Sequence, residues 1–237
     1  MHSDSPARRR FADLARTVLA GRAPADADLR AVIGTPDEDL PALSAAAQAV
    51  RLGRLGDQVS FCAIVNVKSG GCSENCAFCA QSAHHRAETP RHAFLEPARI
   101  GQAARAARVA GASRLGLVSS GLSPADGDFE RLVSAVGLVR EAGLTADASP
   151  GLLNPDQLQR LRAAGLACYH HNLETSRAFF PHICTTHAWD ADVEAVRLAQ
   201  EAGLGVCSGG LFGLGESWDD RLDLALTLGR LGVTSED

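Results

Sequence analysis

The 237-residue sequence has few aromatic residues, a single lysine and no long apolar run. Aromatic residues make up 5% of the chain, and Lys68 is the lysine. No stretch of about 18 apolar residues is present, which argues against a membrane-spanning helix. The basic start, MHSDSPARRR, is followed by no apolar core of a secretory signal. With a net charge of −5 and scattered acidic residues, the chain lacks the basic footprint of a nucleic-acid-binding protein.

Hydrophobic residues make up 46% of the chain and charged residues 22%, a balance typical of a globular protein with a substantial core. Seven cysteines without a secretory signal indicate thiols kept reduced in the cytoplasm. Cys72, Cys76 and Cys79 lie within eight residues of one another. The other four are dispersed, and dispersed cysteines usually act as small apolar side chains. The clustered three are therefore the candidate functional group.

The pattern of apolar and turn-forming residues changes near residue 59. Residues 1–58 form an expected N-terminal helical segment, with helices over 11–19 and 39–54 separated by Gly- and Pro-containing stretches. Residues 59–237 alternate short apolar strands with helices, and four of those helices end at an Ala-Gly pair directly before a strand. Such a repeat predicts parallel strands joined by right-handed crossovers. The expected strands cover 59–67, 114–118, 144–148, 166–173 and 204–207, and the expected helices cover 96–110, 129–142, 154–164, 190–202 and 218–231.

Five strands are too few for a closed (β/α)8 barrel, which typically needs about 250 residues. The expected fold class is therefore α/β of the TIM-barrel type, as a partial, open barrel of about five to six βα units after an N-terminal helical segment. The chain stops at Val233–Asp237, where another strand is expected. Two interpretations stay open, an open partial barrel and a chain truncated before its last strands.

The three clustered cysteines follow the first expected strand with the spacing C-x3-C-x2-C, and Phe78 precedes the third. In barrel-like α/β folds the carboxyl ends of the strands carry the active site. Three thiolates can hold three irons of a [4Fe-4S] cluster and leave the fourth iron open, as in a catalytic metal site. The alternative is a zinc site completed by His84 or His85.

These residues resemble a known family. Cys72-x3-Cys76-x-Phe78-Cys79 after a strand resembles the radical S-adenosylmethionine (SAM) signature. The segments GGCSENCAFCAQSAHH, YHHNLETS, ICTTH and VCSGGLFGLGES together resemble biotin synthases, from about residue 40 to the end. The resemblance implies a (β/α)8 barrel and a homodimer, with a [4Fe-4S] cluster that reductively cleaves SAM to methionine and a 5′-deoxyadenosyl radical. That radical would remove hydrogen atoms from dethiobiotin, a second iron–sulfur cluster would donate the sulfur, and flavodoxin or ferredoxin would supply electrons.

The resemblance also implies roles for single residues. Asn172 and Glu174 match strand-four positions that contact SAM or substrate, and the family commonly has Asp in place of Glu174. The residues matching [4Fe-4S] ligands are Cys72, Cys76 and Cys79, and those matching backbone contacts to the SAM methionine are Ser119, Ser120 and Gly121. Alternation along strand four separates an inward face, Cys168, His170, Asn172 and Glu174, from an outward face, Tyr169, His171 and Leu173. An alternative role for both histidines is that of hydrogen-bonded structural residues.

The second, auxiliary cluster departs from the family pattern. Cys207 matches one of its ligands, but Gly116 and Asp147 stand where the family has two cysteines, and the family's arginine would lie beyond residue 237. Cys62 has inward parity on the first strand, and by resemblance that position also faces the sulfur-donating cluster. Cys62 and Cys207, with Asp147 or Cys168, are therefore candidate ligands of an auxiliary cluster, [2Fe-2S] or other. The alternative is that Cys62 and Cys168 are buried apolar side chains, and Cys184 is expected to be structural.

Three functions are consistent with this pattern. The first is a biotin synthase-like sulfur transferase that converts dethiobiotin to biotin, and Cys62 and Cys207 favour it. The second is a radical SAM enzyme without sulfur insertion, which Gly116 and Asp147 favour. The third is a truncated, non-catalytic paralogue that binds a cluster, suggested by the end at Asp237. Iron and sulfide content would separate the first two.

Overall fold

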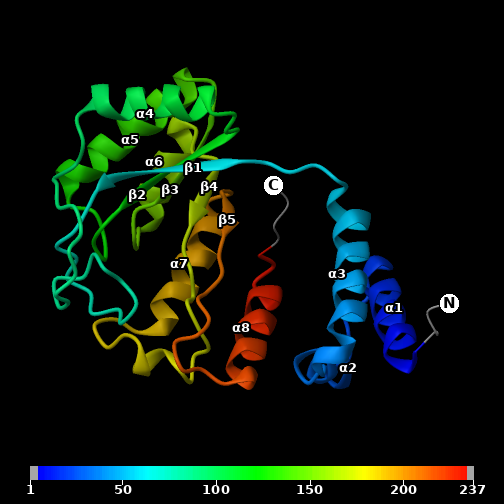
Figure 1. Ribbon diagram of the computed structural model, residues 1–237. Coiled ribbons are helices and arrows are strands. Elements are labelled where there is room, and N and C mark those ends of the chain that lie inside the picture. The colour runs from blue at the N-terminus through cyan, green and yellow to red at the C-terminus, as the bar shows by residue number, and fades with distance from the viewer. Residues whose placement is uncertain (1–4, 234–237) are drawn as a thin grey trace. The chain divides into compact units, whose positions relative to one another are not determined.

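A computed structural model describes residues 5–233, and these divide into two compact units, residues 5–59 and 60–233 (Figure 1). The strand expected after Val233 falls on residues 234–237, outside the described residues. Within the described part of the chain, no helix is both long and apolar enough to cross a membrane.

The first unit consists of helices, as its sequence predicts. It contains α1 (Pro6–Leu19), α2 (Asp26–Ile33), a 3₁₀ turn (Asp37–Asp39) and α3 (Leu40–Leu55). The hydroxyl of Ser5 caps α1 by accepting a hydrogen bond from the amide of Arg8. Helix α2 was not predicted. It has eight residues, fewer than the window of about 11–18 residues over which apolar periodicity indicates a helix.

The second unit is an α/β structure with five parallel strands in the order β1-β2-β3-β4-β5. The open sheet confirms the expected class. The strands are β1 (Cys62–Lys68), β2 (Arg114–Ser119), β3 (Thr145–Ser149), β4 (Cys168–His170) and β5 (Gly205–Cys207). The helices are α4 (Pro97–Val109), α5 (Asp126–Glu141), α6 (Pro155–Ala164), α7 (Trp189–Glu201) and α8 (Trp218–Arg230).

The main core of this unit lies between the sheet and helices α4 to α7 (Figure 1). Leu115, Leu117 and Tyr169 point from the strands into it and are almost fully buried. The Tyr169 hydroxyl finds a partner by donating to the carbonyl of Gly151, at 2.6 Å. Because side chains alternate along a strand, the neighbours of these residues point to the opposite face, where the candidate site lies.

The four Ala-Gly helix ends are confirmed. Gly111, Gly143, Gly165 and Gly203 all have positive φ, between 75° and 97°, the conformation that lets a helix end and the chain turn back. An arginine from the preceding helix caps two of these ends. Arg140 donates to the carbonyl of Ala164 at 3.1 Å, and Arg162 donates to that of Ala202 at 2.7 Å.

Strand β4 is shorter than expected, because the ladder with β5 ends at His170, paired with Cys207. Beyond it the chain stays close to the segment after β5. Leu173 donates to the carbonyl of Gly209, and Glu174 forms an isolated bridge with Gly210. Glu174 has φ of 63°, unusual for a residue with a side chain. The predicted strand over 166–173 therefore ends in an irregular segment that presents Asn172 and Glu174.

Candidate active site

A cleft of about 360 Å³ lies at the carboxyl ends of the five strands, on the face opposite the helices. The loop with the clustered cysteines forms one wall, and the irregular segment after β4 forms another. The predicted site residues in its lining are Cys72, Cys76, Cys79, Ser119, Ser120, Gly121, Asn172, Glu174 and Cys207. The structure therefore brings nine of the ten predicted site residues to one cavity. Cys62, at the start of β1, is exposed and does not line it.

The cysteine loop is held by its own backbone. The amide of Cys72 donates to the carbonyl of Gln81 at 3.0 Å, and the amide of Ala83 donates back to Cys72 at 2.8 Å. The cysteine thiols are partly buried. His84 and His85 each place Nε2 at 2.9 Å from a backbone carbonyl of the loop. Since the loop itself engages these imidazoles, the geometry does not favour a zinc site that uses them.

A second segment, more than 100 residues away in sequence, fixes the cysteine loop in place. Asn75 donates from Nδ2 to the hydroxyl of Thr185 at 2.7 Å and accepts from the Thr185 amide at 2.9 Å. The amide of Ala77 donates to the carbonyl of Ile183 at 2.8 Å. Cys76 and Phe78 pack on a small buried cluster with Phe180. The ICTTH segment thus supports the cysteine loop.

An ionic chain crosses between these two segments. Nδ1 of His187 lies 2.7 Å from Oε2 of Glu74, and its Nε2 lies 3.4 Å from Oδ2 of Asp192. Oδ1 of Asp192 is in turn 2.8 Å from Nε2 of His171. The hydrogen bond to Asp192, supported by that to Glu74, raises the pKa of His187 to about 9. His187 is therefore an imidazolium held between two carboxylates at neutral pH.

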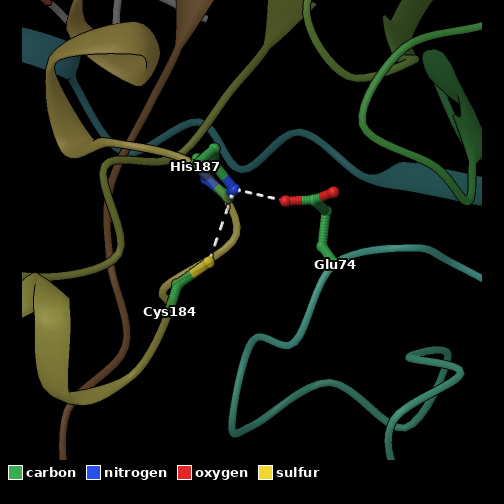
Figure 2. Close-up of side chains that lie close together, drawn as sticks. All are labelled: Glu74, Cys184 and His187. Carbon is green, nitrogen blue, oxygen red and sulfur yellow. Dashed lines mark hydrogen bonds and ion pairs between the residues drawn. The ribbon is translucent and has the colours of Figure 1, made fainter.

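Cys184 lies beside this chain, with Sγ 3.4 Å from Nδ1 of His187 (Figure 2). Its sulfur is also 3.8 Å from that of Cys76. Burial, together with the neighbouring thiol of Cys184, raises the pKa of Cys76. Without a metal, Cys76 is therefore a neutral thiol, because an isolated thiolate is disfavoured in a buried place.

Glu174 is the main acidic group on the opposite side of the cleft. Burial raises the pKa of its carboxyl to about 7, against a hydrogen bond from Asn172 that lowers it. Within the described residues, its buried Oε2 has no hydrogen-bond partner. Buried polar atoms are normally paired, so an orphaned carboxylate oxygen and a positive φ in a cleft together indicate a place for a polar ligand.

Comparison with known proteins identifies the family. A model of the radical SAM superfamily matches residues 66–228. The biotin synthase of Pelotomaculum thermopropionicum is 44% identical, over 95% of this chain and 70% of that protein. The biotin synthase of Geotalea daltonii is 47% identical, over 81% and 59%. Among solved structures, methylornithine synthase matches with a TM-score of 0.82 and 25% identity, covering 92% of this chain and 64% of that one.

The chain belongs to the radical SAM superfamily and, within it, to the biotin synthase family. It spans 59% and 70% of the length of the two biotin synthases named above. Membership implies a [4Fe-4S] cluster, SAM, a small-molecule substrate and a reductant. The donor set fits the first two, because three partly buried thiols and one carboxylate oxygen that has no partner among the described residues lie around the same cleft.

Asp147, which the sequence offers as a candidate ligand of an auxiliary cluster, is paired with an arginine. Asp147 is 1% exposed and takes two hydrogen bonds from Arg114, both 2.8 Å long. Cys168 is buried on the same face of the sheet. Both oxygens of Asp147 are therefore occupied by a guanidinium, which weakens the prediction that this residue is a ligand.

Sequence reasoning missed the roles of Glu74, His187 and Asp192. They come from three segments, and none belongs to a recognisable ligand spacing. The available signal was that Glu74 lies inside the cysteine motif and His187 ends the ICTTH segment. Cys184, expected to be structural, is indeed buried, but it lies against Cys76. His171, expected on the outward face, lines the cleft and bonds to Asp192.

Proposed function

We propose that this chain is a biotin synthase that converts dethiobiotin to biotin. The observation that carries the proposal is the convergence on one cleft of the Cys72, Cys76 and Cys79 thiols and the Glu174 carboxylate, whose Oε2 has no partner among the described residues. When bound there, a [4Fe-4S] cluster would pass an electron from a reductant to SAM and so supply the radical that abstracts hydrogen from dethiobiotin, whereas sulfur insertion needs a separate sulfur donor.

The protein's part is to bind and orient. The three cysteines hold the cluster, and the segment Ser119–Gly121 offers backbone groups to the methionine portion of SAM. Asn172 and Glu174 hold the ribose, with Glu174 accepting hydrogen bonds from its hydroxyls. The ionic chain through His187 keeps the cysteine loop against the ICTTH segment, so that the thiols stay in place while SAM enters.

We further propose Cys62 and Cys207 as ligands of an auxiliary cluster that supplies the sulfur. A flavodoxin or ferredoxin as electron donor, a homodimer and a cytoplasmic location complete the proposal. The occupied carboxylate of Asp147 favours a second candidate, a radical SAM enzyme that does not insert sulfur.

Anaerobic reconstitution followed by three assays tests the proposal. The chain should show broad absorption near 400 nm, cleave SAM to 5′-deoxyadenosine with a strong reductant, and form biotin from dethiobiotin. Cys76→Ala should abolish all three. Cys184→Ala is the matched control. It removes a thiol outside the motif whose sulfur lies 3.8 Å from that of Cys76, and the variant should retain the cluster.

Retained SAM cleavage by Cys76→Ala would refute the assigned cluster ligands. SAM cleavage without biotin formation would support the second candidate.

A further inference from the structure

A second group of side chains of the types that bind metals lies on the inner face of the sheet. The strand register places Gly116, Asp147 and Cys168 in one row across β2, β3 and β4. Two residues further along, His170 pairs with Cys207 of β5. Since residues two apart on a strand share a face, Cys168, His170 and Cys207 all point to the inner side.

Three of these residues already lie at metal-binding separations. One ligand atom each of Asp147, Cys168 and His170 lies within 4.8 Å of the other two. Cys168 is buried and His170 is partly buried.

Asp147 differs from its two neighbours because its carboxylate is committed elsewhere. Arg114 donates from Nε to Oδ2 and from Nη2 to Oδ1, a bidentate pair that is 14% and 1% exposed. Nε2 of His170 is 3.9 Å from Oδ2, too far for a hydrogen bond. Withdrawing Asp147 to bind a metal would leave Arg114 without this partner in a nearly buried position, which is costly. Among the described residues, the His170 ring has no such partner to lose.

We propose that Cys168, His170 and Cys207 are protein ligands of the auxiliary iron–sulfur cluster, and that Asp147 is not. This inference rests on the proposed function for the existence of that cluster. Cysteine with imidazole is an established ligand set for iron–sulfur clusters. The Arg114–Asp147 pair lies beside these residues, since Asp147 is in register with Cys168. Cys62, in register with Arg114, supplies the remaining thiol.

The experiment compares iron and sulfide per chain after anaerobic reconstitution. The unmodified chain should hold iron in excess of the about four atoms of one [4Fe-4S] cluster. Cys168→Ala and His170→Ala should each lose that excess and keep about four irons, which also shows that the variant has folded. Asp147→Asn, which keeps an oxygen for Arg114, should retain the excess. Thr145→Val is the matched control, because Thr145 lies on the same face and pairs with Arg114 in the sheet. This variant should also retain the excess iron.

Histidine ligation has a spectroscopic signature of its own. With ¹⁵N-labelled histidine, pulsed EPR of the reduced auxiliary cluster should show nitrogen coupling, and His170→Ala should abolish it. Labelling histidine alone separates this signal from any arginine nitrogen.

The outcomes separate the two proposals. About four irons per chain with active SAM cleavage would refute sulfur donation by an auxiliary cluster, and this inference with it. Excess iron that survives in both Cys168→Ala and His170→Ala would overturn the ligand set and leave the proposed function standing. Loss of the excess iron in Asp147→Asn, but not in the other two variants, would do the same. Excess metal that is zinc, without added sulfide, would also overturn the inference.

Discussion

At the scale of single residues, two polar groups define the site. One lacks a hydrogen-bond partner for a buried oxygen, and the other carries a charge that two carboxylates hold. Glu174 has a buried oxygen without a partner among the described residues and a positive φ. His187 is charged because two carboxylates flank it. The unpaired oxygen and positive φ of Glu174 are costly to folding unless they serve a ligand, and the charged His187 holds the cysteine loop, so both residues are informative about function.

The raised pKa of Glu174 predicts pH-dependent SAM binding. Because the proposed contact needs a carboxylate, SAM affinity should increase as the pH rises from 6 to 8, through the value of about 7. A charge-assisted hydrogen bond contributes about 1.5–3 kcal/mol, so full ionisation should strengthen binding roughly ten- to a hundred-fold. Glu174→Gln should bind weakly at both pH values. Equilibrium dialysis under anaerobic conditions measures this, and an equal pH response in the variant would contradict the role of Glu174.

The raised pKa of Glu174 has the opposite effect on the stability of the SAM-free chain, which should decrease as the pH rises. A carboxyl group with a raised folded-state pKa favours the folded state fully below pH 4.5, and that contribution is lost as the pH rises through about 7.

His187 predicts a second pH effect, on stability. Its pKa rises from 6.5 to about 9 on folding, so its contribution is fully present below pH 6.5 and is lost as the pH rises through 9. That shift corresponds to at most about 3 kcal/mol. Urea unfolding of the cluster-free chain at pH 6.5 and 9.5 should show a larger loss of stability than in His187→Gln. Identical losses in the two proteins would show that the ionic chain does not stabilise the fold.

At the scale of elements, the regular part of the fold depends on helix ends. Each helix from α4 to α7 is followed by a glycine with positive φ, and arginines of the preceding helices reach the ends of α6 and α7. The sequence predicts these ends because glycine tolerates positive φ better than other residues. The arginine caps were not predictable, since they join residues of different helices.

Of these helix ends, the one at Gly165 should lose the most stability when its glycine is replaced. It has φ of 97°, and an added Cβ would lie 2.5 Å from Nη1 of Arg140. Gly165→Ala should therefore destabilise the chain by about 1–2 kcal/mol or more. Gly137 is the matched control, because it lies inside α5 with nothing within 4 Å of an added Cβ. Gly137→Ala should stabilise by about 0.5–1 kcal/mol. Thermal denaturation of both variants tests this, and equal effects would refute the helix-end argument.

At the scale of the whole α/β unit, the sheet has two edges, β1 and β5, in the part of the chain that the structure describes. Strand β5 has three residues, whereas β3 has five and is paired on both sides. Edge strands with a single partner open more easily than central ones. On the inner face of β1, Ile64 is 68% exposed, so this face is not completed by the described residues.

Hydrogen–deuterium exchange should reflect that arrangement. Amides of β2 and β3 should be the most protected of the unit, and those of β5 should exchange faster, because fewer neighbours cover them. The measurement is exchange of the intact chain followed by mass spectrometry at peptide resolution. Protection of β5 equal to that of β3 would show that another strand pairs with it, and concentration dependence would assign that strand to a second copy.

The sequence alone determined the βα repeat, the parallel sheet, the cysteine loop and the family, because periodicity, Ala-Gly helix ends and motif spacing are local properties. Only the tertiary structure decided which distant groups meet. It placed His187 between Glu74 and Asp192. It also ended β4 at His170, so that Glu174 faces the cleft, and paired Asp147 with Arg114. These contacts join residues from different strands and loops, and their formation depends on how the chain folds back on itself.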